Sequence, residues 1–262
     1  MPRMHIVLGA LVVAASATLT HPVAAQDFMV TAEDSAYLAR SYAGGAAVAS
    51  AMNSYARDRA GRSAPRSRGQ RSSPPPASPT PPTASQRRTL NFARDAAVTR
   101  DVNQRLAASM ARPGNGINAE ALTAALNTGR LQGEFGRLLR EFDMSPDNLA
   151  DVVAGYLIIN WEVANDTDSR PFSRGYAAVR NDVASALTAS GATQRLTAAQ
   201  KQEFADALIT TAMLTVEGRR QLLRSRDNAA KQRLRNAARD GARQMGVDVT
   251  AVRLTNAGFT PR

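Results

Sequence analysis

The chain has 262 residues, of which 44% are hydrophobic, and its 33 Lys and Arg residues against 22 Asp and Glu residues give a net charge of +11. It contains no cysteine and only two histidines, His5 and His21, so disulfides and thiolate metal sites are excluded. Almost all of its cations are arginines, the two lysines being Lys201 and Lys231. Because this bias accompanies abundant alanine, it is weak evidence by itself for phosphate recognition.

Residues 1–25 have the three parts of a secretory signal in the required order. Arg3 supplies an early positive charge, an apolar run extends from Ile6 to about Leu19, and small residues precede a cleavage site after Ala25. The run is too short for a membrane span. We expect export to the periplasm or the medium, with no integral membrane segment left after cleavage. The alternative is an N-terminal membrane anchor.

Cleavage after Ala25 removes both histidines and limits the chemistry of the mature chain. Ser-His-Asp and Cys-His nucleophiles cannot then be assembled, and metal sites built on imidazole or thiolate are excluded. The stretch NDTDSR at 165–170 lacks the glycine and the distal glutamate of a calcium loop, which indicates a loop that ends a helix. We therefore predict no cofactor and no metal site.

Two segments precede the main folded part. Residues 26–56 are rich in Ala and Gly and contain a capping-box-like TAED, which predicts a helix weakened at Gly44 and Gly45 that either docks on the rest of the protein or frays. Residues 57–88 hold seven of the 13 prolines, eight arginines and no large apolar residue. Such a segment cannot bury enough surface to offset its ordering entropy, so we predict a disordered linker that acts as a spacer or as a docking segment.

Residues 89–262 are long enough for one hydrophobic core, and their apolar spacing is helical nearly throughout. Helix starts are indicated at Ser145 and Thr197, and a helix end at Gly246. The tail that follows alternates in part, which is typical of extended backbone. The sequence therefore predicts an all-α fold, with a single orthogonal or bundle-like helical domain behind a disordered linker and a short, extended C-terminal tail.

The stretch GYLIINWEVAND at 155–166 contains the only tryptophan of the chain. Helical spacing predicts that one face of this helix is buried and that Asn160 needs a hydrogen-bond partner. The predicted buried face consists of Val152, Tyr156, Ile159 and Val163, broadened by Leu157 and Trp161.

Glu162 and Glu217 are the candidate catalytic residues, because glycoside hydrolysis requires only two carboxylic acids. Glu162 follows Trp161 in an apolar helix, and Glu217 ends another apolar stretch that could face it. The sequence does not give the separation of the two groups. The alternative is that Glu162 lies on the outer side of its helix, outside the predicted buried face.

The last predicted helix carries four cations at a spacing of four residues, which places them on one face. They are Lys231, Arg235, Arg239 and Arg243. Such a stripe is typical of a surface that binds anionic envelope components or an acidic envelope protein, and equally of a plain solvated face. No aromatic residues are interleaved to stack on bases, so a specific nucleic-acid partner is not expected.

The stretch LREFDMSPDNLADVVAGYLIINWEVAND, followed by LTAAQKQEFADALI and ARQMGVDVTAVRLTNAGF, resembles an uncharacterised family of exported bacterial helical proteins, a domain of unknown function. The resemblance covers about residues 91–259. Its signature residues in this chain are Asp147, Asn148, Asp151, Asn160, Trp161, Gly246 and Phe259. The resemblance implies a mostly helical exported domain and no activity.

We therefore expect a non-enzymatic protein with a binding or structural role in the bacterial envelope or secretome. A carboxylate-dependent glycan hydrolase is one alternative. A binder of anionic envelope components through the basic helix is the other.

Overall fold

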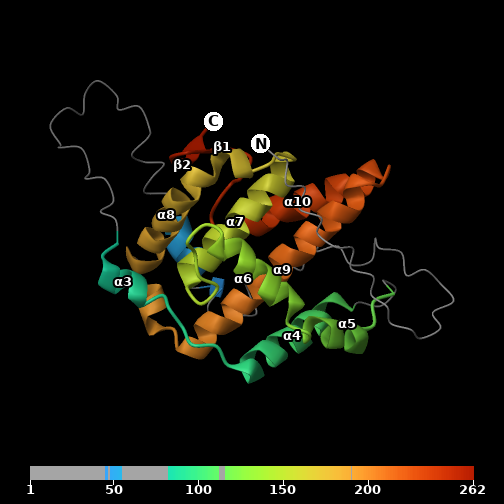
Figure 1. Ribbon diagram of the computed structural model, residues 1–262, viewed down its shortest axis with the longest axis horizontal. Helices are drawn as coiled ribbons and strands as arrows, with labels where there is room; N and C mark the ends of the chain where they lie inside the picture. The colour runs from blue at the N-terminus through green and yellow to red at the C-terminus, as the bar shows by residue number, and fades with distance from the viewer. Residues whose placement is uncertain (1–44, 47, 55–81, 112–115, 190) are drawn as a thin grey trace, which may run out of the picture.

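The computed structural model describes residues 45, 46, 48–54, 82–111, 116–189 and 191–262. The predicted signal peptide and the predicted linker up to residue 81 lie outside these residues. The described part is built from helices and one two-stranded sheet, which confirms the all-α class (Figure 1). None of the helices in this part is both long and apolar enough to cross a membrane.

Helix α7 (Leu149–Asn165) is the central helix, and other helices surround it (Figure 1). Fourteen of its 17 residues are buried. It packs against α8 (Tyr176–Ala189), α9 (Ala198–Leu223) and α10 (Asn228–Gln244). The predicted buried face is confirmed except at Ile159, which is half-buried. Burial extends well beyond that face because α7 has neighbours on several sides.

The remaining described helices lie around this centre. α4 (Ala96–Met110) packs against α5 (Ala119–Leu126) and α9, and α6 (Arg130–Arg140) packs against α7 and α9. The shorter elements are α3 (Ala84–Arg88), η2 (Arg170–Gly175) and η3 (Ala192–Arg195). α3 lies at the end of the segment predicted to be a linker, so helical structure begins a few residues earlier than the sequence indicated.

Helix ends follow local capping, with one correction to the sequence prediction. The N-cap of α7 is Asn148 rather than Ser145, because the Asn148 Oδ1 accepts hydrogen bonds from two backbone N–H groups of the first turn at 2.9 and 3.3 Å. Thr197 forms the predicted capping box at the start of α9. Gly246 ends α10 in the left-handed conformation, with φ +77°, as predicted.

The described residues nearest the N-terminus form a helix that packs on the main domain. Residues 45, 46 and 48–54 are helical, and their apolar side chains join the hydrophobic core. These side chains include Val48, Ala51 and Met52. A Cβ at Gly246 would lie 2.8 Å from the backbone N of Asn53, so only glycine permits this approach. For this part of the segment 26–56, docking rather than fraying is observed.

The C-terminal tail is a β-hairpin, in agreement with the predicted extended backbone. β1 (Val252–Thr255) pairs antiparallel with β2 (Gly258–Pro261). The Nε1–H of Trp161 donates to the carbonyl of Val252 at 3.2 Å, which ties the hairpin to α7. A Cβ at Gly175 would lie 1.9 Å from the carbonyl oxygen of Thr255, so the hairpin also requires glycine at the end of η2.

Candidate functional site

Two signature residues before α7 hold residues 91–94 against the domain. The side-chain amide of Asn148 donates to Asn91 Oδ1 at 2.6 Å, and the backbone N–H of Phe92 donates to the carbonyl of Asp147 at 3.0 Å. The carboxylate of Asp147 forms an ion pair with Arg94 at 2.6 Å. These contacts join segments far apart in the sequence, and their role is structural.

The other signature residues are also framework residues. Asp151 accepts a hydrogen bond from the backbone N–H of Ser145 at 2.8 Å, and burial raises the pKa of its carboxyl group. Asn160 finds the predicted partner within its own helix, since its Nδ2 donates to the carbonyl of Tyr156 at 2.8 Å. Phe259 packs on the core from the hairpin. The resemblance was thus carried by residues that position helices.

A buried polar network that the sequence analysis missed lies between α4 and α9. Asp206 is completely buried, pairs with Arg94, and accepts hydrogen bonds from Thr99 Oγ1 at 2.7 Å and Gln202 Nε2 at 3.2 Å. Burial opposes the charged form of Arg94, but Asp206 and Asp147 raise its pKa above the ordinary value. The sequence does contain an indication of this network, because Asp206 is a lone acidic residue inside the apolar run FADALIT.

A pocket of about 340 Å³ lies where α6, α7, α9 and η2 meet. Its walls are mostly apolar and include one glycine, Gly155. The apolar side chains are Phe135, Leu138, Leu139, Phe142, Met144, Ile158, Ile159, Val163, Met213 and Val216. A Cβ at Gly155 would lie 2.9 Å from Leu139 Cδ2, so this glycine lets α6 approach α7. The pocket size and lining are those of a small-ligand site.

One wall of this pocket is polar and contains Glu162. The carboxylate of Glu162 forms an ion pair with Arg219 at 2.7 Å and accepts a hydrogen bond from Ser169 Oγ at 3.2 Å. Ser169 Oγ and the hydroxyl of Tyr176 are 2.6 Å apart, so the chain of contacts continues into α8. Burial raises the pKa of Tyr176, and the nearby Glu162 adds to this shift. We name Arg219, Glu162, Ser169 and Tyr176 the polar chain.

The two candidate catalytic carboxylates do not form a pair across this pocket. Glu162 lines it, with 26% of its side chain exposed, whereas Glu217 is not among the lining residues. Glu217 instead bonds to Arg220 at 2.9 Å and to Gln221 at 3.3 Å on the same helix. Sequence reasoning therefore found one residue of the pocket. It missed Ser169, Tyr176 and Arg219, which come from other elements and carry no local motif.

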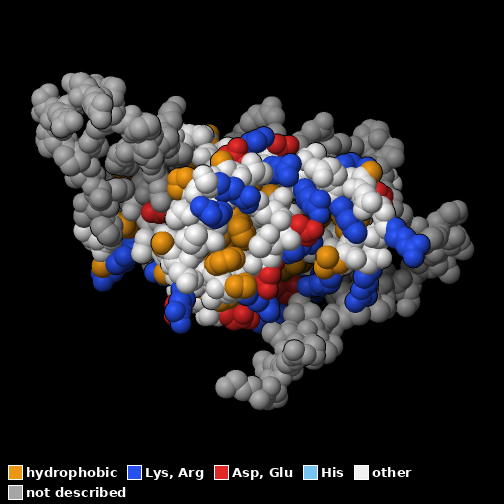
Figure 2. Space-filling model, turned by 90° about the horizontal axis from the view of Figure 1, so that it is seen from above, with side chains coloured by type: hydrophobic (Ala, Val, Ile, Leu, Met, Phe, Trp, Pro, Cys, Tyr) orange, Lys and Arg blue, Asp and Glu red, His pale blue; other side chains and the backbone are white. Residues whose placement is uncertain are grey.

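The predicted basic stripe on α10 is only partly available to an anion. Arg235 pairs with Asp166 at 2.6 Å, and Arg243 pairs with Asp248 at 3.2 Å. A hydrogen bond from the Thr250 hydroxyl is the main cause that lowers the pKa of Asp248, and Arg243 adds to it. Figure 2 shows basic side chains spread widely over one face with acidic ones among them, rather than gathered in one patch.

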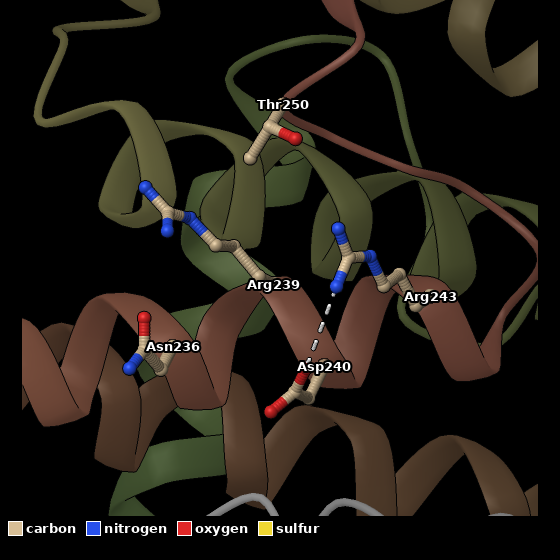
Figure 3. Close-up of a pocket in the computed structure, with 5 residues that line it drawn as sticks. All are labelled: Asn236, Arg239, Asp240, Arg243 and Thr250. Atoms are coloured by element: carbon tan, nitrogen blue, oxygen red, sulfur yellow. Dashed lines mark ion pairs between the residues drawn. The ribbon is translucent and has the colours of Figure 1, made fainter.

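A second, more open pocket of about 470 Å³ lies beside the stripe (Figure 3). Arg239 and Arg243 both project from α10 toward the side where Thr250 lies, and the guanidinium of Arg239 points away from Asp240 (Figure 3). The Nε of Arg239 is buried and has no hydrogen-bond partner among the described residues. Of the four predicted anion-binding residues, these two arginines line the pocket, while Lys231 and Arg235 do not.

The loop 165–170 ends α7 as predicted. Asp166 adopts φ +50° at the C-cap and contacts Arg219 at 3.7 Å, in addition to its pair with Arg235. The carboxylate of Asp168 accepts a hydrogen bond from the backbone N–H of Arg170 at 3.0 Å. Within the described ranges, no three His, Cys, Asp or Glu side chains are placed to hold a metal ion.

None of the seven signature residues lines the pocket at α6, α7 and α9 or the pocket at α10. Comparisons with curated proteins and with solved structures find no match. The chain matches a family model over residues 1–262, and it therefore belongs to the family described as "Family of unknown function (DUF6683)".

Proposed function

We propose that this protein is a non-enzymatic, exported binding protein whose ligand occupies the pocket between α6, α7 and α9. The observation that carries the proposal is the pocket itself, about 340 Å³ in volume and lined mainly by apolar side chains. Small-ligand sites have this size and composition, with a few polar groups that orient the ligand. Here those groups are the polar chain.

The arrangement of carboxylates favours binding over glycan hydrolysis. A glycosidase of the common type holds two carboxyl groups on opposite sides of one scissile bond. In this protein Glu162 forms contacts with Arg219 and Ser169, and Glu217, which does not line the pocket, pairs with Arg220. The glutamates on the pocket wall other than Glu162 are Glu134 and Glu141, and Glu134 bonds to Arg130 at 3.0 Å.

Export is the second part of the proposal, and it rests on the sequence of residues 1–25. Fractionation of cells that produce the full-length chain tests it directly. We expect the protein in the periplasm or the medium, with an N-terminus at Gln26. Recovery of an uncleaved chain with Met1 in the cytosol would refute export and would leave the pocket proposal unaffected.

The binding proposal is tested with a neutral apolar fluorophore, N-phenyl-1-naphthylamine. Val216 lines the pocket, and Leu214 is a half-buried residue of the same helix that does not. We expect saturable binding to the wild type and to Leu214→Trp, and at least a tenfold loss of affinity for Val216→Trp, because the indole fills the pocket. Circular dichroism shows that both variants are folded. Equal binding by the two variants would place the ligand elsewhere.

A parallel assay addresses the hydrolase alternative. We expect no turnover of peptidoglycan or other glycans by the purified protein. Turnover that disappears in Glu162→Gln would overturn the non-enzymatic assignment, whatever the fluorophore shows.

Anion binding at the α10 pocket is a second candidate function, favoured by the unpartnered Nε of Arg239. Co-sedimentation with anionic vesicles at low salt tests it. We expect Arg239→Gln to weaken association more than Arg233→Gln, an exposed arginine of the same helix outside the pocket. Equal losses would indicate a general charge effect and no site.

A further inference from the structure

We propose that the ligand of the pocket between α6, α7 and α9 is a single-chain aliphatic carboxylate of medium length. This inference rests on the proposed binding function and adds to it the chemical class of the ligand. The hydrocarbon chain lies along the apolar wall. The carboxylate lies at the polar chain, beside Arg219 and Arg170.

The apolar wall fits a flexible hydrocarbon. It combines side chains of different shape from three helices, such as Phe135, Ile158 and Met213, and none of the ten apolar side chains on it carries a polar atom that would need a partner. A water molecule occupies about 30 Å³ in the liquid, and a methylene group is of similar size. A volume of about 340 Å³ therefore accommodates roughly ten to twelve carbons, which is one chain and not two.

The charges on the wall favour a negative head group. Four arginines and three glutamates line the pocket, so the wall carries an excess of one positive charge. Two of the arginines, Arg137 and Arg170, are exposed and have no acidic partner among the described residues. An unpaired cation on the wall of an apolar pocket favours the binding of an aliphatic carboxylate over that of a neutral amphiphile of the same length.

The polar chain indicates where that head group lies. Arg219 bonds to Glu162 through Nη1 at 2.7 Å, and its Nη2 lies 3.7 Å from the carboxylate of Asp166, too far for a hydrogen bond. A guanidinium presents five donors, so Arg219 can hold Glu162 and still donate to a ligand oxygen. Arg170 directly follows Ser169, a member of the polar chain, and places a second positive charge at the same end of the pocket. The head group therefore lies at η2, and the hydrocarbon extends toward α6.

The test is displacement of N-phenyl-1-naphthylamine by a series of linear carboxylates and alcohols of six to fourteen carbons, below the micelle concentration of each carboxylate and the solubility limit of each alcohol. Each methylene buried in the pocket contributes about 0.8 kcal/mol, which is roughly a fourfold gain in affinity. We expect that gain per methylene up to roughly ten to twelve carbons and a plateau beyond. We expect decanoate to bind at least tenfold more tightly than decanol at low salt.

A matched pair of variants tests the head group. Arg170 and Arg174 are both exposed arginines of η2, but only Arg170 lines the pocket. We expect Arg170→Gln to reduce the affinity for decanoate about five- to tenfold and to leave decanol unchanged, because a partly exposed charge pair contributes about 1 kcal/mol. Arg174→Gln should bind both ligands as the wild type does.

The failure of this inference differs from the failure of the proposed function. If decanol and decanoate bind equally, or Arg170→Gln and Arg174→Gln behave alike, the carboxylate assignment is refuted while the pocket remains a binding site. If affinity does not rise with chain length, the aliphatic assignment is refuted. If neither the neutral fluorophore nor any chain binds, or Val216→Trp has no effect, the proposed function itself is refuted.

Discussion

The buried ion pair of Arg94 and Asp206 is expected to be the most sensitive polar contact of the fold, and Asp206→Ala tests this. The Asp206 side chain has 0% exposure, whereas Arg94 is 29% exposed. The substitution leaves Arg94 without its buried partner and removes the acceptor used by Thr99 and Gln202. The segment before α4 then keeps the two hydrogen bonds between the backbone of Asp95 and the side chain of Gln202 on α9, both at 2.7 Å.

The magnitude follows from these exposures. Loss of one partner of a buried pair costs about 3–5 kcal/mol. Arg94 is partly exposed and keeps Asp147, so we expect the lower end, about 3 kcal/mol. For a domain of this size each kcal/mol lowers the melting temperature by about 2–4 °C. The expected decrease is therefore about 6–12 °C, measured by calorimetry or by circular dichroism at 222 nm.

Asp147→Ala is the matched control, because Asp147 contacts the same guanidinium but is 51% exposed. Exposed ion pairs contribute about 0–1 kcal/mol, so its melting temperature should fall by no more than about 4 °C. In addition, the double variant Arg94→Met, Asp206→Leu should be more stable than Asp206→Ala, since no unpaired charge remains. Equal effects of Asp206→Ala and Asp147→Ala would refute the reasoning.

Four further predictions concern the framework. Burial raises the pKa of Asp151, so the contribution of this carboxyl group to the free energy of unfolding is fully present below its unfolded pKa and is lost as the pH rises through its folded pKa. In urea titrations, the stability of Asp151→Asn relative to the wild type should therefore increase between pH 3 and 7. The pKa of Asp248 is lowered, so Asp248→Asn should lose relative stability over the same range, and parallel curves would contradict both. Gly246→Ala adds left-handed strain of about 1–2 kcal/mol and a clash with the N-terminal helix, so it should lower the melting temperature more than Gly191→Ala, where a Cβ meets nothing within 4 Å. Trp161→Phe removes one hydrogen bond, worth about 1 kcal/mol, and should increase amide exchange in the hairpin selectively.

The fold class was predictable because helical periodicity and capping are local signals. Thr197 and Gly246 mark helix boundaries through contacts within a few residues. The predicted helix start at Ser145 was wrong for a physical reason. Serine is a common N-cap residue, but the hydroxyl of Ser145 accepts a hydrogen bond from the backbone N–H of Asp147, in the turn before α7, at 3.1 Å. The cap is Asn148, whose amide also binds Asn91, a long-range contact that local patterns do not contain.

The pocket was not predictable, and α6 shows why. In the sequence, four apolar residues of α6 and the turn after it are in line at helical spacing, namely Leu131, Phe135, Leu138 and Phe142. In the structure these residues differ, because Leu131 is buried outside the pocket, Phe135 is buried at the pocket wall, and Leu138 and Phe142 are half-buried on that wall. A spacing of three or four residues aligns side chains on one side of a helix, but it does not say where the neighbouring helices stop covering that side. That limit is set by how α6 crosses α7 and α9.

Signature residues and pocket residues are different residues, so substitutions in the two groups should affect stability and ligand binding differently. The signature residues lie in helix caps, helix contacts and the hairpin, so substituting them should reduce stability and binding together, through loss of the fold. Val216 and Arg170 lie on the pocket wall outside the hydrophobic core, and Val216 is partly buried while Arg170 is exposed, so they can change without removing a core contact. A variant at one of these positions that keeps the wild-type melting temperature and loses the ligand separates binding from folding. A change at Trp161 or Asn148 cannot make that separation, because both residues hold the chain in place.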